Sequence, residues 1–184
     1  MIPKILKADY FFDGSVEYLK SKHFEIPLNK ASSGQQEVLW ILIQLFVLTL
    51  EYTPSLLTIE EPEAHLYPTA RVDLLQLIMV FVHANPHNEV IITTHSPYLL
   101  TAANNLLFAY RVLQKHPEQK AAIEQQVLSE SWINPKHFGA YYVTNEALTN
   151  IFNPETGVIS ESALDDASEN IMNVFDELMD IYKS

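Results

Sequence analysis

Two adjacent glutamates at the end of an apolar run are the residues of this sequence best placed to do chemistry. Glu60 and Glu61 follow residues 56–59, whose apolar and β-branched side chains predict a buried strand, and Pro62 ends it. In open α/β sheets, ligands bind beyond the carboxyl ends of the strands. There, one carboxylate could hold Mg²⁺, usually through water, while the other polarises an attacking water molecule. The alternative is an acidic loop that caps a helix starting at Pro68, because a helix N-terminus favours negative charge.

Two further segments flank these glutamates in the sequence. The Ser32–Gln36 loop opens a predicted helix, where backbone N–H groups and the helix dipole favour an anion and Gly34 permits its close approach. A capped helix without a ligand is the alternative for this loop. His95 follows a second predicted strand and lies in Thr94-His95-Ser96-Pro97. It could donate a hydrogen bond to a phosphate, or it could be a satisfied buried histidine.

The elements that must position these residues alternate between helix and strand. Hydrophobic periodicity predicts helices over residues 34–50 and 68–84, and strands over residues 56–60 and 89–93. The first helix is apolar on nearly all sides, which predicts that it is buried between layers. The alternation favours an α/β fold with a mostly parallel sheet flanked by helices.

The C-terminal part of the sequence shows different patterns. We expect a strand over residues 106–112, a partly exposed helix over 117–131, antiparallel strands over 140–144 and 147–152, and an amphipathic helix over 164–182. The chain therefore divides into a lobe, residues 1–115, and an extension, residues 116–184. We expect the extension, with its small antiparallel hairpin and amphipathic helix, to pack on the same domain.

Composition limits the classes of function. The 184 residues include 11 Lys and Arg against 23 Asp and Glu, so direct nucleic-acid binding by this lobe is not expected. The absence of cysteine excludes a disulfide framework, a thiolate zinc site and a catalytic thiol, and it suits a reducing cytosol. The longest apolar run, residues 38–50, is shorter than the roughly 20 residues of a membrane helix. Residues 1–5 lack the apolar core of a signal peptide. We therefore expect a soluble, cytoplasmic protein.

In this order, the three segments resemble the C-terminal half of an ABC-type ATPase of the SMC/RecF-like and OLD-like branch. The Ser32–Gln36 loop is similar to the signature loop of that family, with Ser33 where a glycine is usual. Leu56–Glu61, Pro62–Leu66 and Ile91–Pro97 are similar in turn to the Walker B strand, the D-loop and the switch-histidine loop. The resemblance implies the C-terminal lobe of a phosphate-loop ATPase fold.

The resemblance, which covers residues 30–100, also implies roles for individual residues. It implies that Glu61 is the catalytic glutamate, that His95 lies at the γ-phosphate, and that Glu60 is the acid on the Mg²⁺ side. It implies contacts with the nucleotide for members of the signature loop and the D-loop, namely Ser32, Ser33, Gly34, Gln35, Gln36, Glu63 and Ala64. ATP and Mg²⁺ are the cofactors that these roles require.

The chain departs from the family's pattern at the phosphates. It contains no Gly-x-x-x-x-Gly-Lys-[Ser/Thr] loop, and none of its four glycines precedes a lysine. We therefore expect a phosphate-loop-bearing N-terminal half or partner subunit to complete the ATP site, with a homodimer as the assembly of the full-length protein. A non-catalytic interaction module derived from such an ATPase is the alternative. A third hypothesis is a stand-alone metal-dependent hydrolase that uses Glu60, Glu63, His65 and His95.

Overall fold

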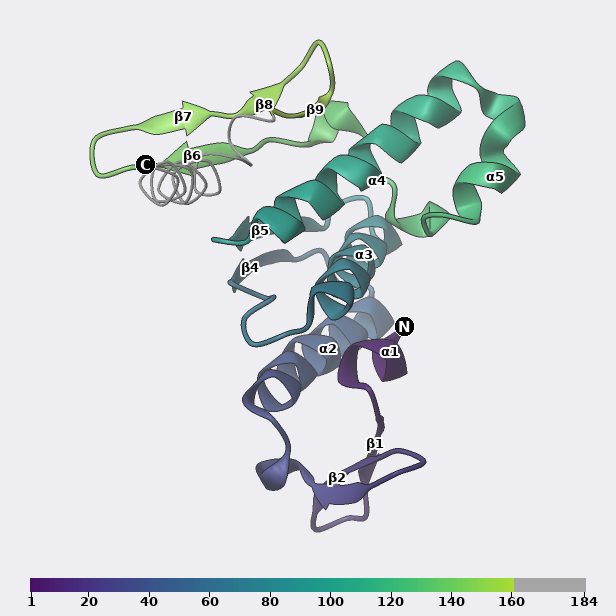
Figure 1. The fold of residues 1–184 in the computed structure, drawn as a ribbon, viewed down its shortest axis with the longest axis vertical. Coiled ribbons are helices and arrows are strands. Elements are labelled where there is room, and N and C mark those ends of the chain that lie inside the picture. Colours follow the sequence, from purple (N-terminus) through teal and green to yellow (C-terminus); the bar gives the residue numbers. More distant parts are fainter. Residues whose placement is uncertain (161–184) are drawn as a thin grey trace, which may run out of the picture.

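The computed structural model describes residues 1–160, and Figure 1 shows the long helices in the middle with β-structure at either end. The predicted amphipathic helix at 164–182 lies outside the described residues. The α-helices are α1 (Ile2–Leu6), α2 (Ser33–Glu51), α3 (Pro68–Ala84), α4 (Pro97–Lys115) and α5 (Lys120–Glu124). Short 3₁₀ helices are η1 (Leu28–Lys30), η2 (Pro117–Gln119), η3 (Ser129–Ser131) and η4 (Pro135–His137).

The strands of residues 1–160 form four small sheets. An antiparallel sheet has the order β1 (Asp9–Phe12), β2 (Glu17–Lys20), β3 (Glu25–Pro27). A parallel pair joins β4 (Leu56–Glu60) to β5 (Glu89–Thr93). Two antiparallel pairs follow, β6 (Tyr141–Val143) with β7 (Leu148–Asn150) and β8 (Phe152–Asn153) with β9 (Val158–Ile159). The mixed α/β class is therefore confirmed, but the parallel part of the described chain is two strands and not a mostly parallel sheet.

The elements around the candidate site begin and end close to where the sequence predicts them. α2 begins at Ser33 because Ser32 caps it, and α3 begins with Pro68, whose fixed φ and missing N–H suit the first helical position. The two predicted strands correspond to β4 and β5. Between them, α3 forms the crossover that a parallel pair requires.

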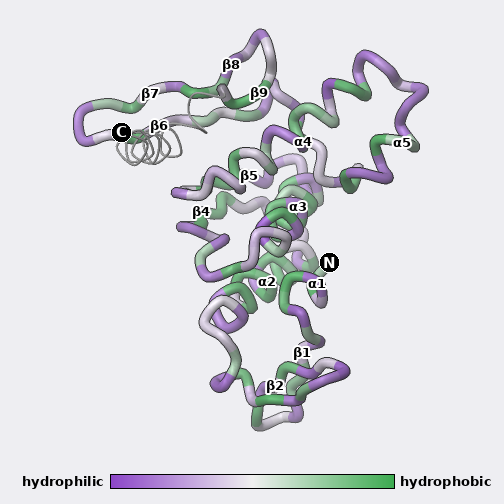
Figure 2. Tube along the Cα trace, in the orientation of Figure 1, coloured by the Kyte–Doolittle hydropathy of each residue, from purple (hydrophilic) through white to green (hydrophobic). Residues whose placement is uncertain are grey.

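The core lies where α1, α2, α3 and α4 meet, together with the inner face of β4. Figure 2 shows hydrophobic residues gathered along α2 and α3. Leu57 and Ile59 of β4 are buried and belong to this core. The largest fully buried apolar side chains are Phe81, Leu6, Leu19, Leu39, Leu42, Leu74, Ile78, Leu106, Leu107, Ile159 and Val38.

The prediction that α2 is buried between layers is wrong for residues 1–160. One face packs in the core through Val38, Leu39, Leu42 and Leu45, while other large apolar side chains are exposed, namely Trp40, Phe46, Val47 and Leu50. α2 is the one described helix long and apolar enough to cross a membrane by length and composition, a test that core helices of soluble proteins also pass. Its buried residues, Gly34, Val38, Leu39, Leu42 and Leu45, show that one face of α2 belongs to the protein core.

The strand predicted over residues 106–112 is also wrong, because α4 spans this segment. Its buried residues recur at helical spacing, namely Leu99, Ala102, Ala103, Leu106, Leu107 and Ala109. Asn104 lies inside this helix and does not form a turn with Asn105. The side chain of Asn104 instead accepts from the backbone N–H of Ile159 at 2.7 Å and donates to the Ile159 carbonyl at 3.1 Å, which fastens β9 to α4.

Candidate functional site

The loops after β4 and β5 begin side by side. In the parallel pair, Glu60 is in register with Thr93, the last residue of β5. The next backbone N–H, that of Glu61, donates to the Thr93 carbonyl at 2.9 Å. Because parallel strands end at the same edge of a sheet, the two loops leave it together. The two predicted segments that contain Glu61 and His95 therefore share one edge.

Glu61 and His95 are brought into direct contact. Nε2 of His95 lies 3.1 Å from Oε1 of Glu61, and the two side chains are 90% and 43% exposed. The backbone of Glu61 has φ = 43°, a left-handed conformation that is unusual for a residue other than glycine and that turns the chain away from the strand. This turn allows the second of two adjacent acids to leave the strand direction. An exposed carboxylate and imidazole in contact can orient a water molecule or accept a proton from one.

Glu63, two residues after Glu61 in the same loop, is buried. Its Oε1 accepts a hydrogen bond from the hydroxyl of Thr94, while its Oε2 has no hydrogen-bond partner within residues 1–160. Backbone bonds from Ala64 N–H to the Glu61 carbonyl and from Leu66 N–H to the Glu63 carbonyl fold the loop into tight turns. Glu63 thus links the loop after β4 to the loop after β5.

The Ser32–Gln36 loop forms a capping box at the start of α2. The backbone N–H of Gln35 donates to the Ser32 hydroxyl at 3.3 Å, and the Ser32 N–H donates to Oε1 of Gln35 at 3.2 Å. The two glutamine amides also donate to backbone carbonyls, Gln35 to Leu6 at 2.7 Å and Gln36 to Ala31 at 2.8 Å. In this structure both side chains hold the loop in place.

Gly34 brings the signature-like loop against the D-loop-like segment. A Cβ atom built on Gly34 would lie 2.4 Å from the carbonyl oxygen of His65, so the two backbones touch where no side chain fits. Beside this contact, Nδ1 of His65 lies 3.0 Å from Oε2 of Glu37. His65 has φ = 57°, a second left-handed residue in the same loop. Residues 61–66 thus contact both of the other predicted segments, through Gly34 and through His95.

Removing the cap of α2 tests whether the Ser32 hydroxyl stabilises the start of this helix. We expect Ser32→Ala to lower the free energy of unfolding by about 1 kcal/mol, because the N–H of Gln35 loses its acceptor. Chemical denaturation of the purified chain measures this change. Ser33→Ala is the matched control, since Ser33 is the first helical residue and does not supply the cap. Equal losses in the two variants would contradict the assignment of Ser32 as the cap.

The sequence does not identify three residues that connect the loops of the site, namely Thr94, Ser96 and Arg71. Thr94 and Ser96 stand in a recognised segment, but nothing marked their side chains as ties between loops. Arg71 stands in α3, where a single arginine three residues after Pro68 carries no pattern. Its Nε donates to the Leu66 carbonyl at 2.9 Å and its Nη1 to the Ser96 hydroxyl at 3.1 Å.

The hypothesis of a stand-alone metal centre finds no support in the described residues. Among residues 1–160, no three His, Asp or Glu side chains are grouped so as to hold a metal ion. The side chains that this hypothesis would combine are engaged separately, His65 with Glu37 and His95 with Glu61. Mg²⁺ differs in its needs, because it is usually held by one or two carboxylates together with substrate phosphates and waters.

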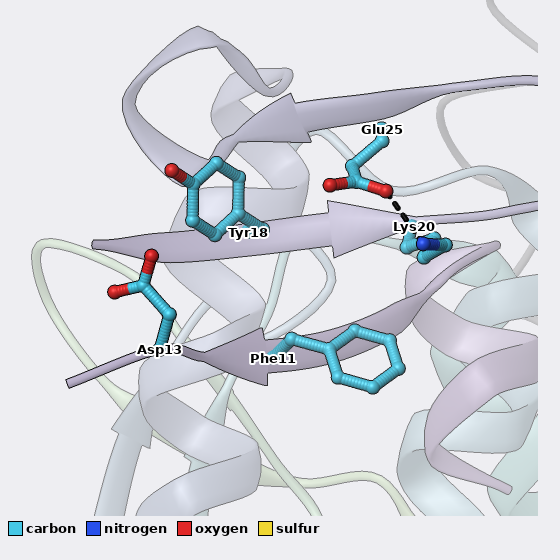
Figure 3. Close-up of a pocket in the computed structure, with 5 residues that line it drawn as sticks. All are labelled: Phe11, Asp13, Tyr18, Lys20 and Glu25. Carbon is cyan, nitrogen blue, oxygen red and sulfur yellow. Dashed lines mark ion pairs between the residues drawn. The ribbon is translucent and has the colours of Figure 1, made fainter. Parts of the chain in front are cut away.

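A pocket of about 320 Å³ lies elsewhere, on the sheet of β1–β3 (Figure 3). It is lined by Phe11, Asp13, Tyr18, Lys20 and Glu25, and Lys20 pairs with Glu25 at 2.6 Å. Hydrogen bonds from the backbone N–H groups of Val16 and Ser15 lower the pKa of Asp13 from its usual value. These bonds shape the β1–β2 turn. No residue predicted for the site lines this pocket.

Comparison with known proteins adds one finding. A family model described as an AAA ATPase domain matches residues 2–100, more than half of the chain. The matched range contains the Ser32–Gln36 loop, β4 and β5 with the loops after them, and Arg71. The chain has no significant match among the curated proteins or among the solved structures.

Proposed function

Because the chain belongs to the AAA ATPase domain family, we propose that it is the ATP-binding and ATP-hydrolysing lobe of an ABC-type ATPase of the OLD-like branch. A phosphate-loop-bearing half or partner subunit completes the ATP site, and the full-length protein acts as a homodimer. The observation that carries the proposal is the contact of 3.1 Å between Glu61 and His95 at the carboxyl ends of two parallel strands. Ligands bind at this edge in open α/β sheets.

The roles in this proposal follow from the position of each side chain. Glu61 polarises the attacking water, and His95, exposed at the same edge, donates a hydrogen bond to the γ-phosphate. Glu60, the exposed last residue of β4, takes the Mg²⁺ side, since Mg²⁺ accepts one or two carboxylates and completes its shell with phosphates and water. When bound, Mg²⁺ neutralises charge on the phosphates. The start of α2 and the D-loop-like segment face the nucleotide.

One face of the parallel pair of β4 and β5 is exposed, which supports the proposal that another layer of the assembled enzyme covers it. Parallel sheets are normally covered on both faces. Here Leu57 and Ile59 point into the core, while the alternate residues on the other face are exposed, including Leu56 at 63% and Ile91 at 51%. We infer that the phosphate-loop-bearing half covers this face and extends the sheet, which would make it mostly parallel in the assembled enzyme.

A binding experiment tests the open face. The partner is the phosphate-loop-bearing half or subunit proposed above, and its association with this chain is measured by calorimetry. We expect Ile91→Glu to weaken association at least 10-fold, because a charge would be buried at the centre of the contact. Phe12→Glu is the control, since Phe12 is 61% exposed on the separate β1–β3 sheet. Equal effects of the two changes would contradict the proposed docking face.

ATP turnover tests the function itself. Phosphate release is measured with MgATP for this chain alone, for the partner alone and for the mixture. We expect turnover in the mixture that exceeds the sum of the separate chains by at least 10-fold. Association and nucleotide binding without turnover would favour the alternative, an interaction module that has kept the surface of such an ATPase and lost its chemistry. Sedimentation of the mixture reports whether two copies assemble.

A further inference from the structure

Arg71 of α3 contacts both loops of the candidate site at once. Its Nε donates to the Leu66 carbonyl, at the end of the loop after β4, and its Nη1 donates to the hydroxyl of Ser96, in the loop after β5. Its guanidinium carbon also lies 5.9 Å from the centre of the Tyr98 ring. A guanidinium is planar and always charged, so it can hold two acceptors at a fixed separation. The half-buried position of Arg71 strengthens these bonds relative to bulk water.

The residues on either side of His95 are both tied to this framework. Thr94 donates to the buried carboxylate of Glu63, and its hydroxyl also accepts from the N–H of Ser96 at 2.9 Å. Ser96 is buried and accepts from Arg71. The imidazole of His95 is itself 90% exposed, and an exposed pair with Glu61 contributes little free energy by itself. The neighbours of His95, and not its own packing, therefore set its position.

We propose that Arg71 is a positioning residue that holds the loop of His95 against the loop of Glu61. It acts through Ser96 on one side and Leu66 on the other, and it touches neither reacting group. The consequence for turnover rests on the proposed function, since the geometry of the pair matters for catalysis only if Glu61 and His95 act on ATP. A misplacement of reacting groups by about 1 Å can lower a rate on the order of 10²-fold.

The positioning role of Arg71 can be tested on this chain alone by NMR, without nucleotide. The sequence has two arginines, Arg71 and Arg111, so arginine labelled with ¹⁵N gives two side-chain Nε–H signals. The signal that is lost in Arg71→Met belongs to Arg71. In Arg71→Met we expect the backbone N–H of Ser96 to exchange with solvent on the order of 10–100-fold faster, the factor that corresponds to loss of a hydrogen bond to a charged group. We also expect the ring nitrogens of His95 to move to the shifts of a histidine that is free of Glu61.

Three further variants separate positioning from general packing. Arg111→Met, a half-buried arginine of α4, is the matched control and should leave the signals of Ser96 and His95 unchanged. Arg71→Lys keeps the charge, but one ammonium on a flexible stem does not reproduce the planar guanidinium. The signals of Ser96 and His95 should therefore change in Arg71→Lys as they do in Arg71→Met. Ser96→Ala removes one bond and keeps the arginine, which preserves the test if Arg71→Met does not fold. Unchanged His95 signals in Ser96→Ala and in folded Arg71→Met would overturn the proposal.

The outcome is separable from the proposed function. In the assembled enzyme, Arg71→Met should lower kcat by at least 10-fold and change KM little, because the nucleotide contacts other than that of His95 remain. If the His95 signals change in Arg71→Met but the unmodified assembly releases no phosphate, the effect of Arg71 on the loop of His95 is supported and the proposed hydrolysis is wrong. If the assembly is active and kcat of folded Arg71→Met equals that of the unmodified enzyme, the positioning role in turnover is wrong.

Discussion

Replacing Glu61 with glutamine is expected to lower ATP turnover of the assembled enzyme by about 10²–10⁴-fold, the range for loss of a general base. Glutamine has nearly the same shape, and its amide oxygen can still accept a hydrogen bond from Nε2 of His95. It lacks the negative charge and the basicity that polarise a water molecule. Nucleotide binding should therefore survive, so that the loss falls on kcat and not on KM. Steady-state phosphate release over a range of MgATP concentrations measures both.

Glu146→Gln is the matched control for this prediction. Glu146 is also exposed, but it lies in the turn between β6 and β7 and not on the parallel pair of β4 and β5. The same change of charge at Glu146 should leave kcat within about twofold. If Glu61→Gln kept full turnover in an assembly whose activity depends on this chain, the role assigned to Glu61 would be wrong, whatever the role of His95.

The elements that the sequence predicts well are those with strong local signals. α2 and α3 begin at a serine cap and at a proline in the first helical position, and β4 and β5 are short apolar runs that end at polar residues. The contact between Glu61 and His95 was predictable in outline, because both follow strands that end at one edge. The left-handed turn at Glu61, which points its carboxylate at His95, required the structure.

Other features depend on contacts between distant segments and leave no local pattern. Residues 106–112 are apolar enough for a strand, and the packing of α4 against α3 decides in favour of a helix. The burial of α2 was overestimated because the sequence shows which residues are apolar, not which of them the described chain covers. Trp40 and Leu50 are 60% and 69% exposed. Arg71 was missed for the same reason, since both of its acceptors come from other elements.

Replacing Gly34 with alanine is expected to lower the free energy of unfolding by about 1–3 kcal/mol, the usual cost of an overpacked contact. Two effects oppose each other at this position. Alanine favours a helix over glycine by about 1 kcal/mol, and it also restricts the unfolded chain. Against this, its Cβ would lie 2.4 Å from the carbonyl oxygen and 2.9 Å from the carbonyl carbon of His65. Backbone atoms cannot rotate away as a side chain can, so the clash should prevail.

Denaturation with urea measures this loss, with the m-value as a check that the same amount of surface is exposed on unfolding. Gly139→Ala is the control, because its Cβ would meet ring atoms of the exposed Tyr141, with 3.2 Å to the nearest, and a side chain can move. We expect a change of less than about 0.5 kcal/mol there. Because Gly34 joins the start of α2 to the loop of Glu61, the alanine variant should also shift the amide signals of residues 61–66. A Gly34→Ala protein as stable as the parent, with those signals unmoved, would show that the two loops do not touch in solution.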